Sequence, residues 1–398
     1  MLIPRRLVDT FPHEFRELLL PWATGIEPPS PDIIQTWEQS FAASVDRQHG
    51  IVTGSGRFAM KLILSGLKLS PGSEIIIPAY TLKDLIPLMK ALELIPIPAD
   101  IDPDHWNVTA ETVNRKITPR TSAVLVLHLF GNPCPVDEIT KLAKLKNIRV
   151  IEDCAHSAGS TLHGRPTGNL GNAAFFSFES IKPINTYGGG MIVTDEDHLA
   201  TEIKQAAAKI DPGGEIAAKV RAALFERFMF RSGLARIPLT LLASSDGQRV
   251  MTLLYRLIQP PPSGPKGYIP IQASLGLKRL ETLNQRVAER RLKAALLRSM
   301  LPSSCRPQQE IPGGNANYYF FVVKVDGEKE SLRRSLLKKG IDAGIGAEIA
   351  DDCAAILSDM DCPNAAELYK KALHLPLHEQ TSHDQLVRMA QILNDICG

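Results

Sequence analysis

Short apolar segments recur along residues 50–200 and alternate with segments of helical periodicity. Each apolar segment is continuous, whereas a half-buried strand would alternate apolar and polar residues, so these segments are typical of strands covered on both faces. They are residues 74–78, 95–101, 122–130, 148–153, 173–178 and 190–194. The intervening residues 57–69, 82–94 and 136–146 repeat apolar side chains every three or four positions, which predicts amphipathic helices. The pattern therefore predicts an α/β fold whose large, mostly parallel sheet is wrapped by helices.

The remaining segments predict further parts around this sheet domain. Residues 1–30 are expected to form an N-terminal arm, and residues 31–268 the large domain, with a helical insertion at about 205–265. One long helix is predicted over residues 271–301, followed by strand and helix patterns up to the C-terminus. Residues 269–398 are therefore expected to form a smaller C-terminal α+β domain.

The helical insertion is basic. Between residues 216 and 259, seven Lys or Arg side chains stand against two acids, Glu226 and Asp246. One interpretation is that these long side chains lie along helices packed on the sheet domain, with their charges in water. The other is a surface that contacts a membrane or an anionic polymer. We favour packing, because the charge of the whole chain is close to neutral.

Composition limits the kind of protein. The 45 basic and 43 acidic residues leave a formal charge of +2, which removes the electrostatic argument for a nucleic-acid partner. The six cysteines form no C-x-x-C pair, so neither a metal site nor a disulfide framework is predicted. Because no secretory leader and no membrane-spanning apolar run is recognisable in the sequence, we expect a cytoplasmic protein.

Polar residues occupy the strand ends at which ligands bind in such sheets. They are His128, Asp153 and Ser177. Lys182 follows Asp153 by 29 positions, although a lone strand-end Asp is commonly a helix cap and a lone Lys commonly a surface residue. A glycine-rich turn, residues 53–57, directly precedes a helix, and helix N-termini attract phosphate. A phosphate cradle, a carboxylate and a lysine in one sheet are the parts that pyridoxal 5′-phosphate (PLP) needs.

In order and spacing, these motifs resemble the DegT/DnrJ/EryC1/StrS family of PLP-dependent sugar aminotransferases. The resemblance is carried by residues 78–81, 99–113, 117–139, 150–159, 164–182 and 188–194. It is weaker over residues 268–395 and absent over the helical insertion. It implies the fold of PLP-dependent transferases of fold type I, PLP as the cofactor, and transamination as the reaction.

The resemblance also implies a role for each motif residue. Lys182 would bind the aldehyde of the cofactor as an internal aldimine and then act as the proton shuttle. Asp153 would face the pyridine nitrogen and keep it protonated. His156 would contact the phenolic oxygen or the face of the ring. The phosphate would be held by Ser177, by the backbone of Gly56 and Arg57, and by the guanidinium of Arg57.

The residue after the motif at 78–81 departs from the family pattern. Leu82 stands where members usually carry an aromatic residue that stacks on the cofactor ring. The stacking face would therefore be aliphatic, or be supplied by Tyr80 or His156.

Two later segments depart as well. Residues 265–270 replace a segment by which a partner subunit usually completes the site, and Lys266 or Tyr268 could substitute for it. Residues 340–353 lack the aromatic residue and the His that are common near the substrate. The usual family arrangement implies a homodimer with shared active sites. Because of these departures, the resemblance does not imply the identity of the sugar.

The leading hypothesis is an enzyme that moves an amino group from an amino acid, expected to be glutamate, to a nucleotide-linked keto-sugar in amino-sugar, polysaccharide or secondary-metabolite biosynthesis. A cyclitol acceptor is one alternative. A PLP-dependent sugar dehydratase is another, although such relatives replace the lysine by histidine and this chain retains Lys182. A third is a non-catalytic regulatory or binding protein on the same fold, which the complete set of Lys182, Asp153 and Ser177 disfavours.

Overall fold

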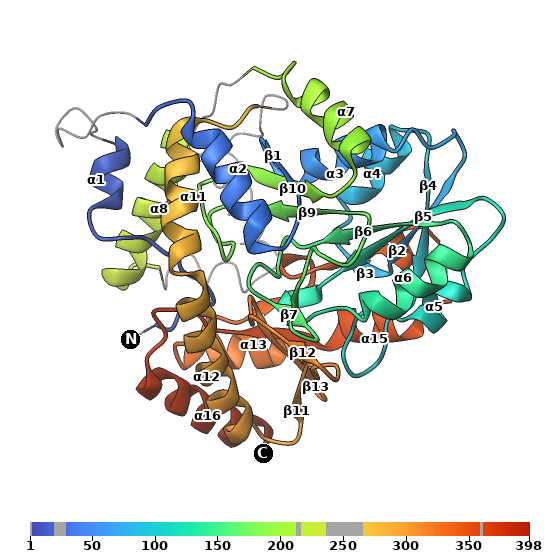
Figure 1. Ribbon diagram of the computed structural model, residues 1–398. Helices are drawn as coiled ribbons and strands as arrows, with labels where there is room; N and C mark the ends of the chain where they lie inside the picture. The colour runs from blue at the N-terminus through green and yellow to red at the C-terminus, as the bar shows by residue number, and fades with distance from the viewer. Residues whose placement is uncertain (1, 20–28, 212–215, 236–265, 359–360) are drawn as a thin grey trace.

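A seven-stranded sheet forms the centre of the larger part of the molecule (Figure 1). The computed structural model describes residues 2–19, 29–211, 216–235, 266–358 and 361–398. In spatial order the strands are β1 (His49–Thr53), β10 (Gly190–Thr194), β9 (Ala173–Ser177), β6 (Arg149–Asp153), β5 (Thr121–Leu127), β2 (Glu74–Pro78) and β4 (Ile95–Ala99). Only β10 runs antiparallel to its neighbours, since every other adjacent pair is parallel. The predicted mostly parallel sheet is confirmed.

Helices cover both faces of this sheet, and the strand residues divide between the two faces. Ile75 and Ile77 of β2 pack on one side, and Ile76 packs on the other, which explains why β2 is apolar throughout. The first face carries α3 (Gly56–Gly66), α4 (Leu85–Lys90) and α7 (Asp197–Ala207). The second carries α2 (Ile33–Ser44), α5 (Ala110–Asn114), α6 (Val136–Leu145), α11 (Pro270–Glu281) and α15 (Pro363–Lys371). This is the layer arrangement that the sequence pattern predicts.

The C-terminal part is built on an antiparallel four-stranded sheet. Its strands are, in spatial order, β11 (Cys305–Pro307), β13 (Phe321–Val325), β16 (Ala372–Leu375) and β14 (Gly344–Ile345). Its core is closed by α12 (Leu283–Met300), α13 (Lys329–Lys338) and α16 (His383–Cys397). An α+β arrangement was expected for this part of the chain, and the structure has one.

The prediction of one long helix over 271–301 is wrong in one respect: the segment is helical, but it forms two helices, α11 and α12. They meet at Thr282, whose φ and ψ are −99° and −2°. Arg286 stabilises the junction: its Nη2 donates to the carbonyl of Arg279 (3.0 Å), and its Nε donates to Oγ1 of Thr282 (3.3 Å). A carbonyl at a helix end lacks an intrahelical partner, so this side chain supplies one.

Short elements connect the two sheets. β3 (Tyr80–Thr81) pairs with β15 (Asp351–Asp352), and β7 (Thr161–Leu162) pairs with β8 (Arg165–Pro166) and β12 (Gly314–Asn315). The remaining short helices are η2 (Leu129–Gly131), η3 (Gly346–Glu348) and α14 (Cys353–Ile356). Segments from the C-terminal part therefore lie directly beside segments that leave the central sheet.

The N-terminal residues and α8 (Ile216–Arg231), the described helix of the insertion, lie together beside α11 (Figure 1). α1 (Glu14–Leu19) packs near α8, whose Val220 is buried with Val8 and Tyr187. This burial supports the packing interpretation for α8, while residues 236–265 of the insertion lie outside the described residues. α7 extends to Ala207, three residues into the predicted insertion. Among the described helices, none has the length and apolarity needed to cross a membrane.

Candidate active site

Asp153 and Ser177 are the last residues of the adjacent parallel strands β6 and β9. The Asp153 side chain is buried, and the backbone N–H of Ala155 donates to its Oδ1 (2.9 Å). Burial raises the pKa of Asp153 to about 6, opposed by this hydrogen bond and by the positive charge of Lys182. The carboxylate is therefore charged at neutral pH, but its burial costs free energy, which a further cationic group in contact with it would offset.

Lys182 lies in the loop between β9 and β10, where its backbone N–H donates to the carbonyl of Glu179 (2.8 Å). Its Nζ lies 4.6 Å from the centroid of the Tyr319 ring. Its charge acts on both Asp153 and His156, lowering the pKa of each. The structure thus brings the lysine, the carboxylate and the imidazole to one place.

His156 presents a neutral imidazole. Burial, and then the charge of Lys182, lower its pKa well below the usual 6.5. The backbone N–H of Phe130 donates to its Nδ1 (3.3 Å), so the proton of the neutral ring must sit on Nε2. One face of the imidazole stacks on Tyr319, with ring centroids 4.6 Å apart and an interplanar angle of 21°. His156 therefore offers one fixed N–H donor.

The glycine-rich turn lies against Ser177. A Cβ on Gly56 would come within 3.0 Å of the Ser177 Cβ, so the first turn of α3 approaches the end of β9. Ser55 caps α3, because its hydroxyl accepts from the N–H of Phe58 (3.2 Å). The side chain of Arg57, in contrast, is exposed and paired with Asp84. The predicted phosphate-binding backbone and Ser177 lie together, whereas the Arg57 guanidinium points to another partner.

The other predicted cofactor contacts lie at different depths. Tyr80 is fully buried in the core, where its ring meets Phe130 edge-to-face at 6.3 Å. Leu82 is 38% exposed. Lys266 lines a cavity of about 260 Å³ beside the glycine-rich turn, together with Glu38 and Lys204. Of the three candidates for the stacking face, His156 is the residue that shares its surroundings with Lys182.

Tyr319 is a site residue that sequence reasoning missed. It precedes β13 of the C-terminal part, and its backbone N–H donates to Oδ1 of Asn317 (2.8 Å). The Asn317 amide in turn donates to the carbonyls of His156 (2.8 Å) and Ala158 (2.9 Å). Residues 317–325 read as a strand in the sequence, and no signal in a single sequence shows which strand-leading aromatic reaches Lys182.

The loop beneath His156 is tightly fitted to Asn317. Phe130 has a left-handed φ of 59°, an unfavourable conformation for an aromatic residue. Gly131 follows with φ 92°, and a Cβ there would come within 1.9 Å of Oδ1 of Asn317. Only glycine fits this position, because any side chain would displace Asn317. Asn317 in turn bonds both the carbonyl of His156 and the backbone of Tyr319, and so holds this pair together.

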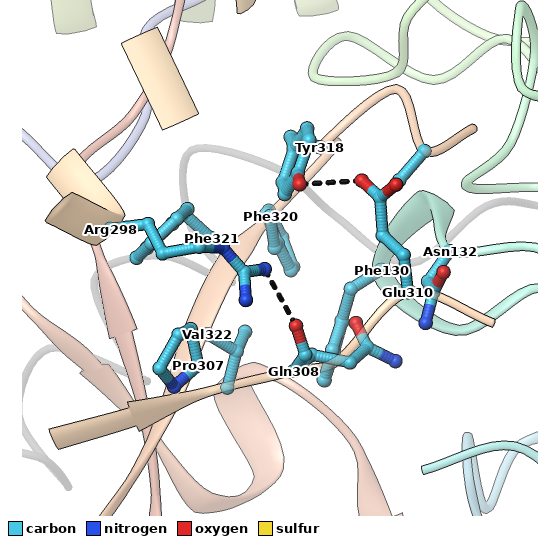
Figure 2. Close-up of a pocket in the computed structure, with 11 residues that line it drawn as sticks. Phe130, Asn132, Arg298, Pro307, Gln308, Glu310, Tyr318, Phe320, Phe321 and Val322 are labelled. Atoms are coloured by element: carbon cyan, nitrogen blue, oxygen red, sulfur yellow. Dashed lines mark hydrogen bonds between the residues drawn. The ribbon is translucent and has the colours of Figure 1, made fainter. Parts of the chain in front are cut away.

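A pocket behind this loop is not a substrate site. Figure 2 shows its lining, to which Phe130 and residues 307–322 contribute. Arg298 donates to the carbonyl of Gln308 (2.7 Å), and the hydroxyl of Tyr318 donates to Glu310. The interior measures about 10 Å³, the space of one ordered water. A space of this size has no room for a sugar.

His128, another strand-end residue, has a structural role. Its Nδ1 accepts from the N–H of Cys134 (3.0 Å), so its Nε2–H donates to Glu152 (3.0 Å). Glu152 also accepts from the backbone N–H groups of Gly168, Leu170 and Gly171. His128, Glu152 and Cys154 lie close enough to hold a metal ion. However, both ring nitrogens of His128 are hydrogen-bonded, to Cys134 and to Glu152, and the carboxylate oxygens of Glu152 also accept from residues 168–171.

The geometry defines a class of site: a buried carboxylate, a lysine and a neutral imidazole at the carboxyl edge of a parallel sheet, beside a helix N-terminus. Comparison with known families gives the same class. The model of the DegT/DnrJ/EryC1/StrS aminotransferase family matches residues 31–210 and 269–394. The chain belongs to this family.

Similar proteins carry related names. GDP-perosamine synthase of Escherichia coli O157:H7 is 37% identical over 166 residues, which is 42% of this chain and 46%, about half, of the synthase. The spore coat polysaccharide biosynthesis protein SpsC of Bacillus subtilis is 27% identical over 91% of this chain and 89% of its own. The PLP form of the putative sugar aminotransferase Spr1654 of Streptococcus pneumoniae has the same fold, with a TM-score of 0.77 at 18% identity, covering 100% of this chain and 99% of that one.

Proposed function

We propose that this protein is a PLP-dependent aminotransferase that moves an amino group from an amino acid, glutamate in the first instance, to a nucleotide-linked keto-sugar. The observation that carries the proposal is that Lys182 and His156 both lie on the Tyr319 ring, while Asp153 ends the strand beside Ser177 and the first turn of α3. Family membership and the similarity to GDP-perosamine synthase support the sugar as the acceptor.

The residues present fit PLP. The first turn of α3 at Gly56 and the hydroxyl of Ser177 would hold the phosphate, since helix N-termini and hydroxyls bind anions. Asp153 would meet the ring nitrogen, whose positive charge would offset the cost of burying the carboxylate. The Nε2–H of His156 would donate to the phenolic oxygen. When bound, PLP supplies the electron sink for a carbanion at the substrate Cα.

The chain's own residues supply the rest of the chemistry. Lys182 would carry a proton at its Nζ between the substrate Cα and C4′ of the cofactor, from Cα to C4′ with the amino donor and in the reverse direction with the acceptor. Asp153 would hold a proton on the ring nitrogen through the whole cycle. Tyr319 and Phe130 would exclude water from the His156 side, because both are buried.

The test is a transfer assay with a panel of acceptors. The purified protein, loaded with PLP, would be given glutamate and then keto-sugars and keto-cyclitols, each free and nucleotide-linked, and the amine product would be detected by mass. We expect one nucleotide-linked keto-sugar to be aminated. A cyclitol product would change the substrate class, and a protein that binds PLP but aminates nothing would favour the non-catalytic alternative.

His156 gives a prediction that separates a hydrogen-bond donor from a packing residue. His156→Gln should stay within about tenfold of the parent kcat/KM, because the amide can donate in place of Nε2–H. His156→Leu should lose about 10- to 100-fold, the usual value of a hydrogen bond to a charged group. Steady-state kinetics with PLP in excess would measure both. Equal kinetics for the Leu and Gln variants would show that His156 only packs.

We also propose a cytoplasmic homodimer in which each active site is completed by the partner subunit. The support is the resemblance of the chain to the family, which implies that a segment of the partner subunit, at the position that residues 265–270 occupy here, completes each site. Sedimentation at assay concentration should show at least a dimer, and a fully active monomer would exclude shared sites.

A further inference from the structure

Three of the five residues that follow Lys182, namely Pro183, Asn185 and Tyr187, form hydrogen bonds to distant segments. The partners belong to the N-terminal residues and to α12. The carbonyl of Pro183 accepts from Nη1 of Arg286 (2.8 Å), the amide of Asn185 donates to the carbonyl of Asp9 (3.3 Å), and the hydroxyl of Tyr187 donates to Oε1 of Glu14 (2.6 Å). The backbone that carries Lys182 is thus tied to segments far away in the sequence.

Glu14 is the centre of these contacts. Its side chain is fully buried, as are those of Tyr187 and Arg279. Besides the Tyr187 hydroxyl, its carboxylate accepts from Nη2 of Arg279 (2.8 and 2.9 Å) and from the N–H of Phe11 (3.1 Å). Arg279 also donates to the carbonyl of Asp9 (2.9 Å). Charge-assisted bonds of this kind are the strong ones, so Glu14 locks the N-terminal residues to α11 and to the Lys182 loop.

Tyr187 needs this support. Its φ of 57° is left-handed, which is unfavourable for an aromatic residue and persists only where the surroundings enforce it. Its backbone N–H donates to Oδ1 of Asn185 (2.8 Å), and its ring is buried with Val8 and Val220. The conformation of the loop therefore depends on the N-terminal residues and on α8, together with Gln272 of α11, whose amide donates to the carbonyls of Thr186 and Gly188 (3.1 Å each).

α8 holds the other end of the loop. Nζ of Lys219 lies 2.8 and 2.9 Å from the two carboxylate oxygens of Glu179, three residues before Lys182. α8 also contacts the N-terminal residues directly, because Nη1 of Arg227 donates to Oγ1 of Thr10 (2.8 Å). Residues 2–19 and 216–231, which we call the clamp, both lie outside the residues that the family model matches.

We propose that the clamp positions Lys182, with Glu14 and Tyr187 as positioning residues that act through the loop and do not touch substrate. The proposal rests on the proposed function, because the position of Lys182 matters only if the lysine reacts with the cofactor. It assigns a role to two segments that lie outside the residues matched by the family model.

The experiment uses Tyr187→Phe, which removes one oxygen atom, and Glu14→Gln, which removes the charge. Glu74→Gln is the matched control. Glu74 is as buried as Glu14 and is bound by Thr118 and Arg120, but it lies at the amino end of β2, away from the edge that carries Asp153. Hydrogen exchange of residues 183–189 would be measured in the cofactor-free full chain. The release rate of PLP, and the response of its visible absorbance band to pH, would be measured in the loaded protein.

We expect the loop to exchange about tenfold faster in both variants, and PLP to leave about tenfold faster, with a shifted pH response of the band; the control should match the parent. Unchanged exchange in Tyr187→Phe would overturn the clamp, and that variant decides if Glu14→Gln does not fold. Faster exchange with unchanged PLP release and band would overturn the positioning of Lys182. A parent that binds no PLP would contradict the proposed function, while exchange would still decide whether the clamp holds the loop.

Discussion

Lys182→Ala is expected to lower kcat by at least about 10³-fold, because it removes both the amine that reacts with the cofactor and the proton shuttle. Lys182 is the lysine whose charge acts on Asp153 and on His156. The fold should survive, since the described partner of its ammonium group is the ring of Tyr319, and such a contact is worth about 0.5–2 kcal/mol.

The measurements are transfer kinetics and borohydride reduction of the loaded protein. Reduction should attach PLP covalently to the parent and to Lys61→Ala, an exposed control on α3, but not to Lys182→Ala. Covalent labelling of Lys182→Ala at a single site would mean that another lysine reacts. Unfolding midpoints of the three proteins would separate loss of chemistry from loss of structure.

The strands and their polar ends follow from the sequence because the relevant signals are local. Apolar runs such as 74–78 and 190–194 coincide with β2 and β10, and Asp153 ends β6 as its strand pattern predicts. The edge at which Asp153 and Ser177 lie follows from the rule for parallel strands. Their roles toward a cofactor stay predictions.

Other parts of the site depend on tertiary contacts that no local pattern encodes. His128 lies near a strand end like Asp153, yet its ring is used to hold Glu152, because its Nδ1 receives the N–H of Cys134. Tyr319 lies beside Lys182 in a turn of the C-terminal part, which Asn317 ties to the carbonyl of His156. The clamp contacts the Lys182 loop through residues that lie more than 170 positions apart in the sequence, as Glu14 of the clamp and Tyr187 of the loop do. The break between α11 and α12 likewise depends on the side chain of Arg286.

Asp153→Asn should have opposite effects on stability and on activity. In the cofactor-free parent, burial raises the pKa of Asp153 from its usual 3.8 to about 6. Because the folded state binds this proton more tightly than the unfolded state, the stability of the parent falls as the pH rises from about 4 to about 6 and then stays low. A difference of about 2 pKa units at 1.36 kcal/mol each corresponds to about 3 kcal/mol.

The Asn variant carries no charge at any pH and can still accept from the N–H of Ala155. The cofactor-free variant should therefore be more stable than the parent by up to about 3 kcal/mol at pH 8, with the gain shrinking as the pH falls through 6. Urea unfolding of both proteins without PLP, at pH 8 and at pH 5, measures this. Ser177→Ala, at the end of the neighbouring strand, serves as a control that should show no such dependence on pH.

With PLP bound the sign reverses, because the protonated ring nitrogen would compensate the carboxylate of the parent and would find no counter-charge in the variant. Loss of one preorganised electrostatic partner typically lowers kcat by about 10²–10³-fold, so Asp153→Asn should bind PLP and transfer poorly. PLP should also raise the unfolding midpoint of the parent more than that of the variant. Activity close to the parent would mean that another carboxylate faces the ring, and a variant less stable than the parent at pH 8 would show that Asp153 stabilises the fold. Only a carboxylate kept for the cofactor lowers stability when the site is empty and supports turnover when PLP is bound.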